Sequence, residues 1–188
     1  MRKLIYAINL TLDGCCDHTK GIADAEIHDF YTKLLLASDT FVYGRKTYGL
    51  MVPYWPEIAR NPGGDVSDNE FANAFVGIRD IVVFSRSLQS GGDEKTRFVT
   101  GDSPERLREE ILSIKNMEGK PILTGGVDLP GQLIALDLID EYIFLIQPLL
   151  VGEGRRLPTS VPEPRKLELL EVTKFDNGGV AMRYGTMR

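Results

Sequence analysis

The sequence predicts a mixed α/β fold, in which a mostly parallel sheet carries helices on both faces and an antiparallel hairpin closes the chain. Short apolar runs alternate with amphipathic segments over most of the chain, the pattern of successive strand-helix-strand units. Near the C-terminus, two strand-like segments flank Asp176-Asn177-Gly178-Gly179, a strong hairpin signal. No repeat or change in composition divides the 188 residues, so we expect a single domain over residues 1–188.

The first half of the chain is expected to contain four strands and three helices. The strands are predicted at 3–12, 41–43, 81–84 and 97–99. A helix over 25–37 follows the N-cap Asp24, a short helix follows Thr47, and another over 68–76 is capped by Ser67 or Asp68. Residues 52–64 are rich in Pro and Gly and are predicted to form a long loop, which in a compact domain is often a lid or a binding loop.

The second half begins with a clear helix start at Asp102-Ser103-Pro104-Glu105, with proline just inside the helix. This helix is predicted to end near Met117. A strand over 122–124 then leads through Gly125-Gly126 into a helix that ends near Leu136. The nearly unbroken apolar run 142–150 predicts a central strand, and the hairpin strands are expected at 166–175 and 180–187.

Composition and charge exclude several functional classes. The net charge of -5 and the pI near 5.1 argue against nucleic acid or an anionic membrane as the main partner. The apolar run at the N-terminus is too short for a signal peptide, and no stretch approaches the roughly 20 apolar residues of a spanning helix. We therefore expect a cytoplasmic protein that binds a small molecule.

The cysteines and histidines do not predict a metal site. Cys15 and Cys16 are adjacent, which suits neither an ordinary disulfide nor, with His18 and His28, a four-ligand zinc site. A reactive thiol at Cys15 is the alternative to two ordinary loop residues.

Three strand ends carry residues that suit a phosphate. Strand 41–43 runs into Gly44-Arg45-Lys46-Thr47, strand 81–84 into Ser85-Arg86, and strand 122–124 into Gly125-Gly126. Glycine permits close approach to the backbone, a helix start offers free N–H groups, and the cations add charge. Ligands of open α/β sheets bind at the carboxyl ends of strands, so the three segments together predict a bound dinucleotide.

The order of these motifs resembles the dihydrofolate reductase fold, and more closely the reductase domain of the bifunctional riboflavin-biosynthesis deaminase/reductase, the RibD C-terminal family. The resemblance covers almost the whole chain. Its matching segments are Thr11-Leu12-Asp13-Gly14, the Gly-Arg-Lys-Thr-Tyr segment 44–48, the segment 83–88, Gly125-Gly126, the segment 138–142 and the segment 148–155. It implies a dihydrofolate reductase-like three-layer sandwich.

The resemblance also implies NADPH as the cofactor. Gly44, Arg45, Lys46 and Thr47 would hold its pyrophosphate and adenosine side, and Ser85 and Arg86 its 2′-phosphate, which favours NADPH over NADH. Gly125 and Gly126, often joined by a cis bond in this fold, would contact the pyrophosphate with Val127 and Asp128. Ala7, Ile8 and Asn9 would lie beside the nicotinamide.

The implied reaction is hydride transfer to a small heterocycle, either pterin-like or 5-amino-6-ribosylaminouracil-like. Asn9, Asp13, Gly14 and Trp55 are the candidate substrate contacts, although Asp13-Gly14 is also an ordinary turn and Trp55 is equally suited to loop packing. Asp13, or a water that it holds, is the first candidate for the proton source, with His28 or Asp29 as competitors.

Two departures from the family pattern keep other readings open. The deaminase motif of the riboflavin enzyme is absent, and no second basic cluster for a substrate ribose phosphate is evident. The alternative is a non-catalytic NADPH- or nucleotide-binding protein of the same fold. A homodimer is expected from the family alone.

Overall fold

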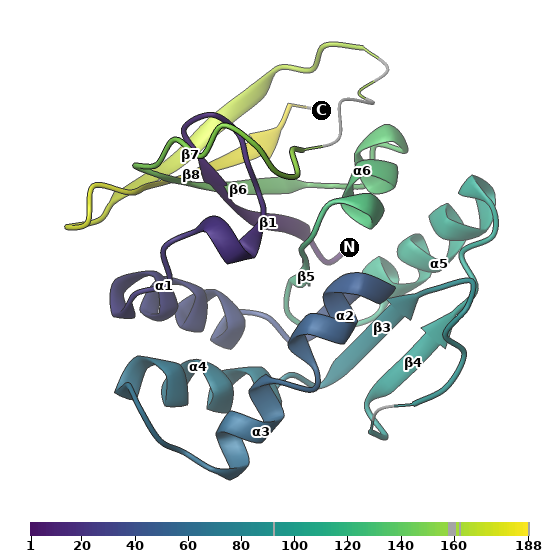
Figure 1. Cartoon of the computed structure of the whole chain (residues 1–188). Coiled ribbons are helices and arrows are strands. Elements are labelled where there is room, and N and C mark those ends of the chain that lie inside the picture. The colour runs from purple at the N-terminus through teal and green to yellow at the C-terminus, as the bar shows by residue number, and fades with distance from the viewer. Residues whose placement is uncertain (92, 158–160, 162, 188) are drawn as a thin grey trace.

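The computed structural model describes residues 1–188 except 92, 158–160, 162 and 188. Within these residues, eight strands form one sheet in the order β4-β3-β2-β5-β1-β6-β8-β7 (Figure 1). The strands are β1 (Leu4–Thr11), β2 (Thr40–Gly44), β3 (Asp80–Phe84), β4 (Thr96–Val99), β5 (Ile122–Thr124), β6 (Glu141–Gln147), β7 (Leu167–Lys174) and β8 (Val180–Thr186).

The sheet is parallel from β4 to β6 and antiparallel at its C-terminal end. Strands β2, β3 and β4 follow β1 in the chain, and each lies further from β1 in the sheet than the one before. Strand β5 then lies between β2 and β1. Strand β6 pairs with the other side of β1, and the hairpin β7–β8 adds antiparallel to β6. The predicted mixed sheet with a closing hairpin is therefore confirmed.

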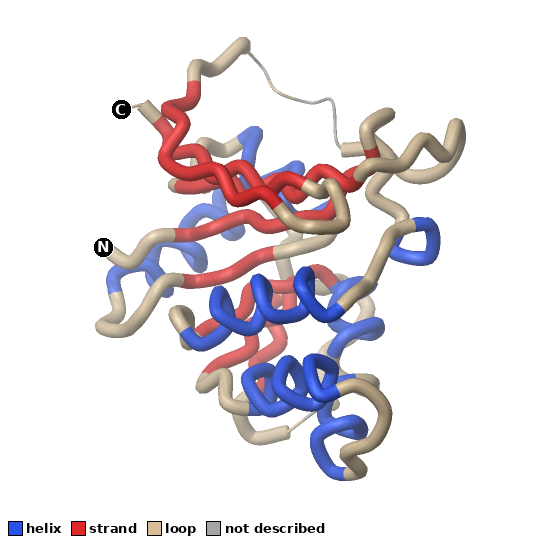
Figure 2. The backbone as a smooth tube through the Cα atoms, turned by 90° about the vertical axis from the view of Figure 1, so that its left-hand side faces the viewer, coloured by secondary structure: helices blue, strands red, loops and turns tan. Residues whose placement is uncertain are grey.

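Helices cover both faces of the sheet and form a three-layer arrangement (Figures 1 and 2). Apolar residues of α1 and α4 belong to the core cluster on one face, and those of α5 and α6 to the cluster on the other. The helices are α1 (Ala25–Leu36), α2 (Arg45–Met51), α3 (Trp55–Arg60), α4 (Val66–Val76), α5 (Pro104–Asn116) and α6 (Asp128–Ala135), with a short 3-10 helix η1 at His18–Lys20.

Local capping explains where three of the helices begin. Asp24 accepts the Ile27 N–H at 3.0 Å at the start of α1, as predicted, and Ser103 accepts the Arg106 N–H at 3.2 Å at the start of α5. The prediction for α4 is wrong by two residues. Its N-cap is Asp65, which accepts the Ser67 N–H at 3.0 Å, so the helix starts at Val66.

The prediction of a long loop over 52–64 is wrong, because this segment contains the helix α3. Pro56 lies in the first turn of α3, where its missing N–H costs no hydrogen bond, so it starts a helix rather than interrupting one. The rings of Trp55 and Phe71 lie 4.3 Å apart, centroid to centroid, which fixes α3 against α4. Packing between helices, which a local composition rule does not see, decides this segment.

Candidate functional site

The sheet order brings the predicted phosphate-binding segments together. Strands β3, β2, β5 and β1 are consecutive neighbours, so Ser85-Arg86, Gly44–Thr47 and Gly125-Gly126 follow the carboxyl ends of three adjacent strands. We call the side of the sheet where the parallel strands end the carboxyl edge, and the opposite side the amino edge. The carboxyl edge is the candidate functional site.

The turns after β2 and β5 are in contact. Gly126 has φ +85°, and a Cβ at this position would collide with Thr47 Oγ1, so both the backbone and the space require glycine. From the core, the Tyr6 hydroxyl donates a hydrogen bond of 2.8 Å to the Gly126 carbonyl. The expected cis bond between Gly125 and Gly126 is wrong, since the described chain contains no cis peptide bond.

Two helices that begin at this contact lack side-chain caps. Gly44 precedes α2 and Val127 precedes α6, and neither residue makes a capping hydrogen bond through its side chain. By contrast, α1, α4 and α5 begin with side-chain caps from Asp24, Asp65 and Ser103. The first N–H groups of α2 and α6 are thus available to an anion.

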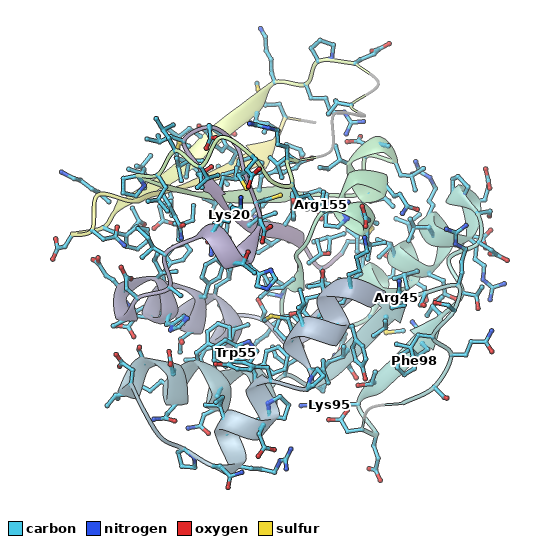
Figure 3. The ribbon with its side chains drawn as sticks, in the orientation of Figure 1. Lys20, Arg45, Trp55, Lys95, Phe98 and Arg155 are labelled. Carbon is cyan, nitrogen blue, oxygen red and sulfur yellow. The ribbon has the colours of Figure 1, made fainter. Side chains whose placement is uncertain are left out.

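Charged side chains surround the same contact. Asp128, at the start of α6, forms ion pairs with Arg155 and with Lys46, the latter at 3.5 Å from Nζ to Oδ2. Arg45 is exposed and has no ion pair within the described part of the chain. Figure 3 shows Arg45, Arg155 and Lys20 on three separate elements around the front of the molecule. All members of the Asp128 pairs are about half exposed or more, so solvent weakens them.

Ser85 and Arg86 lie at the end of β3. Ser85 is buried, and its Oγ accepts the backbone N–H groups of Leu88 at 2.8 Å and Ser87 at 3.2 Å, which shapes the turn. Arg86 is exposed and has no ion pair among the described residues. Ser85 therefore has a structural use in addition to any ligand contact, whereas the exposed guanidinium of Arg86 makes no ion pair with the residues that the structure describes.

Asp13 fastens a loop to the end of β1. Its carboxylate accepts hydrogen bonds from the Thr11 hydroxyl at 2.5 Å and from the Gly152 and Val151 N–H groups at 2.8 and 3.3 Å, and Arg156 lies nearby. The Thr11 hydrogen bond and then the Gly152 N–H lower the pKa of Asp13 to about 2. A carboxyl group with this pKa is ionised at neutral pH, which does not suit the expected role of proton donor.

Residues 151–157, which we call the 151–157 loop, join the end of β1 to the start of α6. Cys15 pairs with Arg156 through the backbone, the Cys16 N–H donates to the Arg155 carbonyl at 2.7 Å, and Lys20 pairs with Glu153 at 2.8 Å. Gly14 and Gly154 have φ of +79° and +116°. The role of Arg155, which reaches Asp128, was not predicted, because nothing local to the sequence indicates this contact.

On β1, the residues expected beside a nicotinamide point to different faces. Ile8 is buried in the core on the α5 and α6 side, whereas Ala7 and Asn9 are half-buried on the α1 side. Asn9 Oδ1 accepts a hydrogen bond of 2.7 Å from the Tyr31 hydroxyl of α1. Residues 9 and 31 are 22 positions apart, so the sequence alone does not indicate this hydrogen bond. Burial raises the pKa of Tyr31, which keeps this hydroxyl a donor.

The competing proton sources lie in different surroundings. His28 Nδ1 is 2.6 Å from Asp68 Oδ1, and the His28 ring packs at 5.8 Å from Trp55 and 5.7 Å from Phe71, centroid to centroid. Asp29 is exposed. His28 and Trp55 therefore belong to the junction of α1, α3 and α4, and Trp55 is at least a packing residue there.

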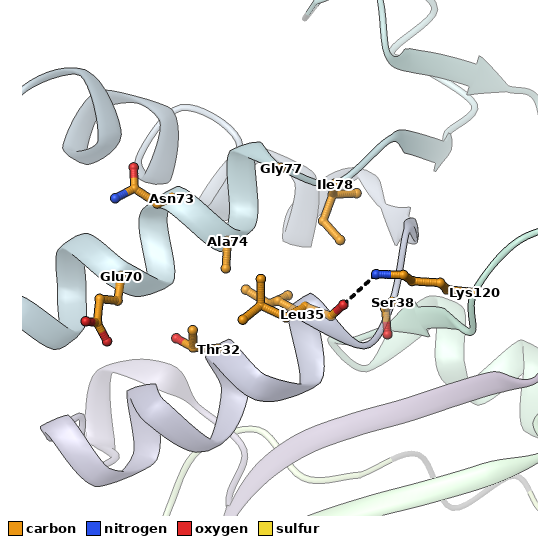
Figure 4. Close-up of a pocket in the computed structure, with 10 residues that line it drawn as sticks. Thr32, Leu35, Ser38, Glu70, Asn73, Ala74, Gly77, Ile78 and Lys120 are labelled. Atoms are coloured by element: carbon orange, nitrogen blue, oxygen red, sulfur yellow. Dashed lines mark hydrogen bonds between the residues drawn. The ribbon is translucent and has the colours of Figure 1, made fainter.

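A cavity of about 440 Å³ lies elsewhere, between the C-terminal halves of α1 and α4 (Figure 4). Lys120 on its rim donates to the Leu36 carbonyl at 2.9 Å, and the neighbouring Ser38 and Ile78 precede strands β2 and β3. The cavity thus opens at the amino edge, away from the free helix starts, and we do not assign the phosphate chemistry to it.

Two further observations bear on which groups could bind at the site. The described residues contain no group of three His, Cys, Asp or Glu side chains arranged to hold a metal ion. Thr124, the last residue of β5, is 2% exposed, and its Oγ1 has no hydrogen-bond partner in the described part of the chain. The carboxyl edge thus retains hydrogen-bonding capacity that the described residues do not use.

Among the described residues, no helix has the length and apolar character needed to span a bilayer.

The fold and the carboxyl edge define a protein of the dihydrofolate reductase-like α/β class, built like the reductase domains of riboflavin biosynthesis. The chain belongs to the RibD C-terminal domain family, a family of reductases, whose model matches residues 2–181.

Individual proteins are similar to this chain over nearly its whole length. The chain is 31% identical to the uncharacterized protein YyaP of Bacillus subtilis (strain 168) over 187 residues, which cover 97% of this chain and 94% of YyaP. Its fold is similar to that of a putative riboflavin biosynthesis protein from Shewanella sp. PV-4, with a TM-score of 0.69, 17% identity and 99% coverage of both chains.

A third relative is longer than this chain. The chain resembles the Thermotoga maritima diaminohydroxyphosphoribosylaminopyrimidine deaminase/5-amino-6-(5-phosphoribosylamino)uracil reductase with a TM-score of 0.63 and 15% identity. The match covers 99% of this chain but 57% of that enzyme. This agrees with the missing deaminase motif.

Proposed function

We propose that the protein is an NADPH-dependent reductase that transfers hydride to a small heterocycle, pterin-like or 5-amino-6-ribosylaminouracil-like. The observation that carries the proposal is the pair of uncapped helix starts, α2 and α6, on either side of the Gly126–Thr47 contact. A pyrophosphate would accept their free N–H groups, with Gly44 and Gly125 permitting close approach and Val127 contributing its backbone.

Cations beside these helix starts would hold the rest of the phosphate charge. Lys46 and Arg155 now face Asp128, and both pairs are exposed enough to exchange that carboxylate for a phosphate. Arg45 would add charge on the adenosine side. In this proposal, Asp128 keeps the two cations close to the site while no anion occupies it.

The choice of NADPH over NADH rests on the end of β3. Arg86 is exposed and free of ion pairs in the described chain, and the Ser85 hydroxyl fixes the turn that presents it. A guanidinium suits a phosphate monoester, which it contacts through two parallel hydrogen bonds. Arg86 is therefore the proposed 2′-phosphate ligand, and Ser85 the residue that orients the turn.

At the other end, the nicotinamide would lie against β1 and supply the hydride. Ala7 is small enough to admit the ring, and Ile8 anchors the strand in the core. Asn9 would contact the substrate through its amide N–H groups, because the Tyr31 hydroxyl already engages its Oδ1. The chain would thus position the reacting rings and add little covalent chemistry of its own.

Substrate positioning and proton supply are assigned to different residues. We assign Asp13 and Gly14 to positioning the 151–157 loop beside the substrate, since the Asp13 carboxylate is ionised and fully engaged. His28 and Asp29 remain the candidate acids, with His28 held between Asp68 and the Trp55 ring. Trp55 would either hold the His28 ring in position or contact the substrate.

The first test is thermal unfolding with NADPH and, in a separate sample, with NADH. A ligand at about 100 times its dissociation constant adds about 2.7 kcal/mol to the free energy of unfolding, and the melting temperature should rise by roughly 5–10 °C. We expect a larger shift with NADPH. Equal shifts with both would reject the 2′-phosphate assignment, and no shift with either would reject the dinucleotide site.

The second test separates a reductase from a protein that only binds. Pterins, dihydrofolate and ribosylaminouracils are offered with NADPH, and oxidation of the nicotinamide is followed by absorbance. Turnover of one substrate class is expected. Tight NADPH binding without turnover across this panel would instead support the non-catalytic binding protein.

A further inference from the structure

Tyr6 is a fully buried residue of β1 whose hydroxyl lies beneath the candidate functional site. In the register of the sheet it pairs with Thr124, the last residue of β5. Edge-on contacts with Tyr142 and Phe144 of β6, at 6.4 and 6.2 Å between ring centroids, hold its ring. Side chains on a strand lean along the strand direction, and the Tyr6 hydroxyl thus reaches past Thr124 to the Gly126 carbonyl, which it contacts at 2.8 Å.

This hydrogen bond fixes the direction of the peptide between Gly126 and Val127. The peptide is planar and trans, as no peptide in the described chain is cis, so its N–H points opposite to its C=O. Because the Gly126 carbonyl points to the Tyr6 hydroxyl, the Val127 N–H points away from it. This N–H donates no hydrogen bond to the residues that the structure describes. It is therefore one of the free donors at the start of α6.

The backbone alone does not fix this direction. The contact with Thr47 and the φ of +85° require glycine at position 126, and glycine has the widest choice of backbone conformations. Rotation of the peptide by half a turn would place the carbonyl oxygen where the N–H now points, and this oxygen would repel an anion. The Tyr6 hydroxyl opposes the rotation, because it would lose its acceptor inside the core.

The Tyr6 hydroxyl also stays a hydrogen-bond donor. Burial raises the pKa of Tyr6 well above its usual value of 10.0, so the phenol keeps its proton at neutral pH. A neutral phenol beneath the site adds no negative charge that would oppose a bound anion.

We propose that Tyr6 is a positioning residue for the anion that binds between the starts of α2 and α6. Its hydroxyl holds the Gly126–Val127 peptide in the orientation that presents the Val127 N–H to a phosphate oxygen. The inference rests on the proposed function only in taking that anion to be the pyrophosphate of NADPH. Because NADPH and NADH share the pyrophosphate, Tyr6 acts on both cofactors alike, in contrast to Arg86.

The variant Tyr6→Phe removes the hydroxyl and keeps the ring. The dissociation constants of NADPH and of NADH should each rise by roughly two- to tenfold, which corresponds to the loss of one hydrogen bond. The ratio of the two constants should stay the same. In turnover, the KM for NADPH should rise while kcat is unchanged, because the pyrophosphate is held equally before and during hydride transfer.

Tyr142→Phe is the matched control. Tyr142 is 5% exposed and packs against Tyr6 in the same aromatic cluster, but the hydrogen bond to Gly126 comes from Tyr6. Each variant loses one hydroxyl from the core, and only Tyr6→Phe should weaken cofactor binding. Circular dichroism and the melting temperature establish that both variants are folded.

A measurement without cofactor separates this inference from the proposed function. The amide resonances of isotope-labelled protein are followed by NMR during titration with inorganic pyrophosphate. The Val127 amide should shift in the unchanged protein and in Tyr142→Phe, and should need more pyrophosphate in Tyr6→Phe. This pattern in a protein that binds neither NADPH nor NADH would reject the dinucleotide and still support the role of Tyr6.

Two results would overturn the role of Tyr6. One is a Val127 amide that does not respond to pyrophosphate in the unchanged protein. The other is a Tyr6→Phe protein that matches the unchanged protein in its response to pyrophosphate and in its affinity for both cofactors. The second result would leave the proposed reductase function in place.

Discussion

The charged side chains at the two edges of the parallel sheet differ in their burial and in their pairing. At the amino edge, several charged side chains are buried and paired with groups of opposite charge. Arg2 pairs with Asp39 and donates to Thr40, and Lys115, at 1% exposed, pairs with Asp140 at 2.6 Å. The Glu141 carboxylate, also buried, holds both Lys3 and Arg183. The buried members of these pairs, Arg2, Lys115 and Glu141, are therefore already engaged within the fold.

At the carboxyl edge, the charges are exposed and the helix starts are open. Arg45 and Arg86 are free of ion pairs in the described chain, and the pairs of Asp128 and Asp13 are partly solvated. The paired charges at the amino edge therefore act on stability, whereas the exposed charges at the carboxyl edge are available to a ligand. Removing one partner of a buried pair leaves an uncompensated charge at a large cost, whereas exposed pairs contribute little and exchange readily. Four substitutions test this separation, beginning with the largest expected effect.

Lys115→Ala should destabilise the fold without touching the site. It removes the ammonium partner of Asp140 and the donor to the Leu138 carbonyl, and breaking a buried ion pair costs about 3–5 kcal/mol. Urea unfolding measures the loss, and titration with NADPH under native conditions should give an unchanged dissociation constant. A loss below 1 kcal/mol, or weaker NADPH binding by the folded variant, would contradict the separation of the two edges.

Gly126→Ala should act on both stability and binding. The alanine must adopt φ near +85° and its Cβ meets Thr47, so we expect a cost of about 1–3 kcal/mol together with at least tenfold weaker NADPH binding. Gly49→Ala is the control, since Gly49 lies in α2 with open space around it. Calorimetric titration of both variants distinguishes the two positions. Normal NADPH affinity in a folded Gly126→Ala protein would argue against the proposed pyrophosphate site.

Arg86→Gln should act on binding alone. Removal of a charged hydrogen bond to phosphate costs about 1.5–3 kcal/mol, which corresponds to a 10- to 100-fold loss of NADPH affinity. NADH affinity and the melting temperature of the free protein should stay the same, because Arg86 is exposed and has no ion pair in the described chain. An equal loss for both cofactors would show that Arg86 acts on something other than the 2′-phosphate.

Asp13→Asn should lower stability in a pH-dependent manner. The pKa of Asp13 is lowered from 3.8 to about 2 in the folded protein, so its ionised carboxylate stabilises the fold above pH 4. This contribution is lost as the pH falls from about 4 to 2. The difference in melting temperature between the unchanged protein and the variant should therefore be present at pH 7 and disappear near pH 2. A constant difference over this range would mean that the carboxylate charge is not the cause.

Local patterns were enough to predict most elements and the chemical type of the site. Asp24 capped its helix as predicted, the Asp176–Gly179 turn joined β7 to β8, and the apolar runs became strands. These features depend on residues within a few positions of each other, where propensity and periodicity act. The strand ends with Gly and basic residues were recognised for the same reason.

What the sequence by itself determined is therefore the class of fold and the kinds of residue at each strand end. Only the tertiary structure decided that β5 enters between β2 and β1, which sets Thr47 against Gly126, and that Tyr6 reaches the Gly126 carbonyl. It likewise placed the Asp13 carboxylate where it accepts the Gly152 N–H of the 151–157 loop. The physical reason is sequence distance. Tyr6 and Gly126 are 120 positions apart, and Asp13 and Gly152 are 139 apart, so their contacts depend on packing of the whole sheet rather than on local preference.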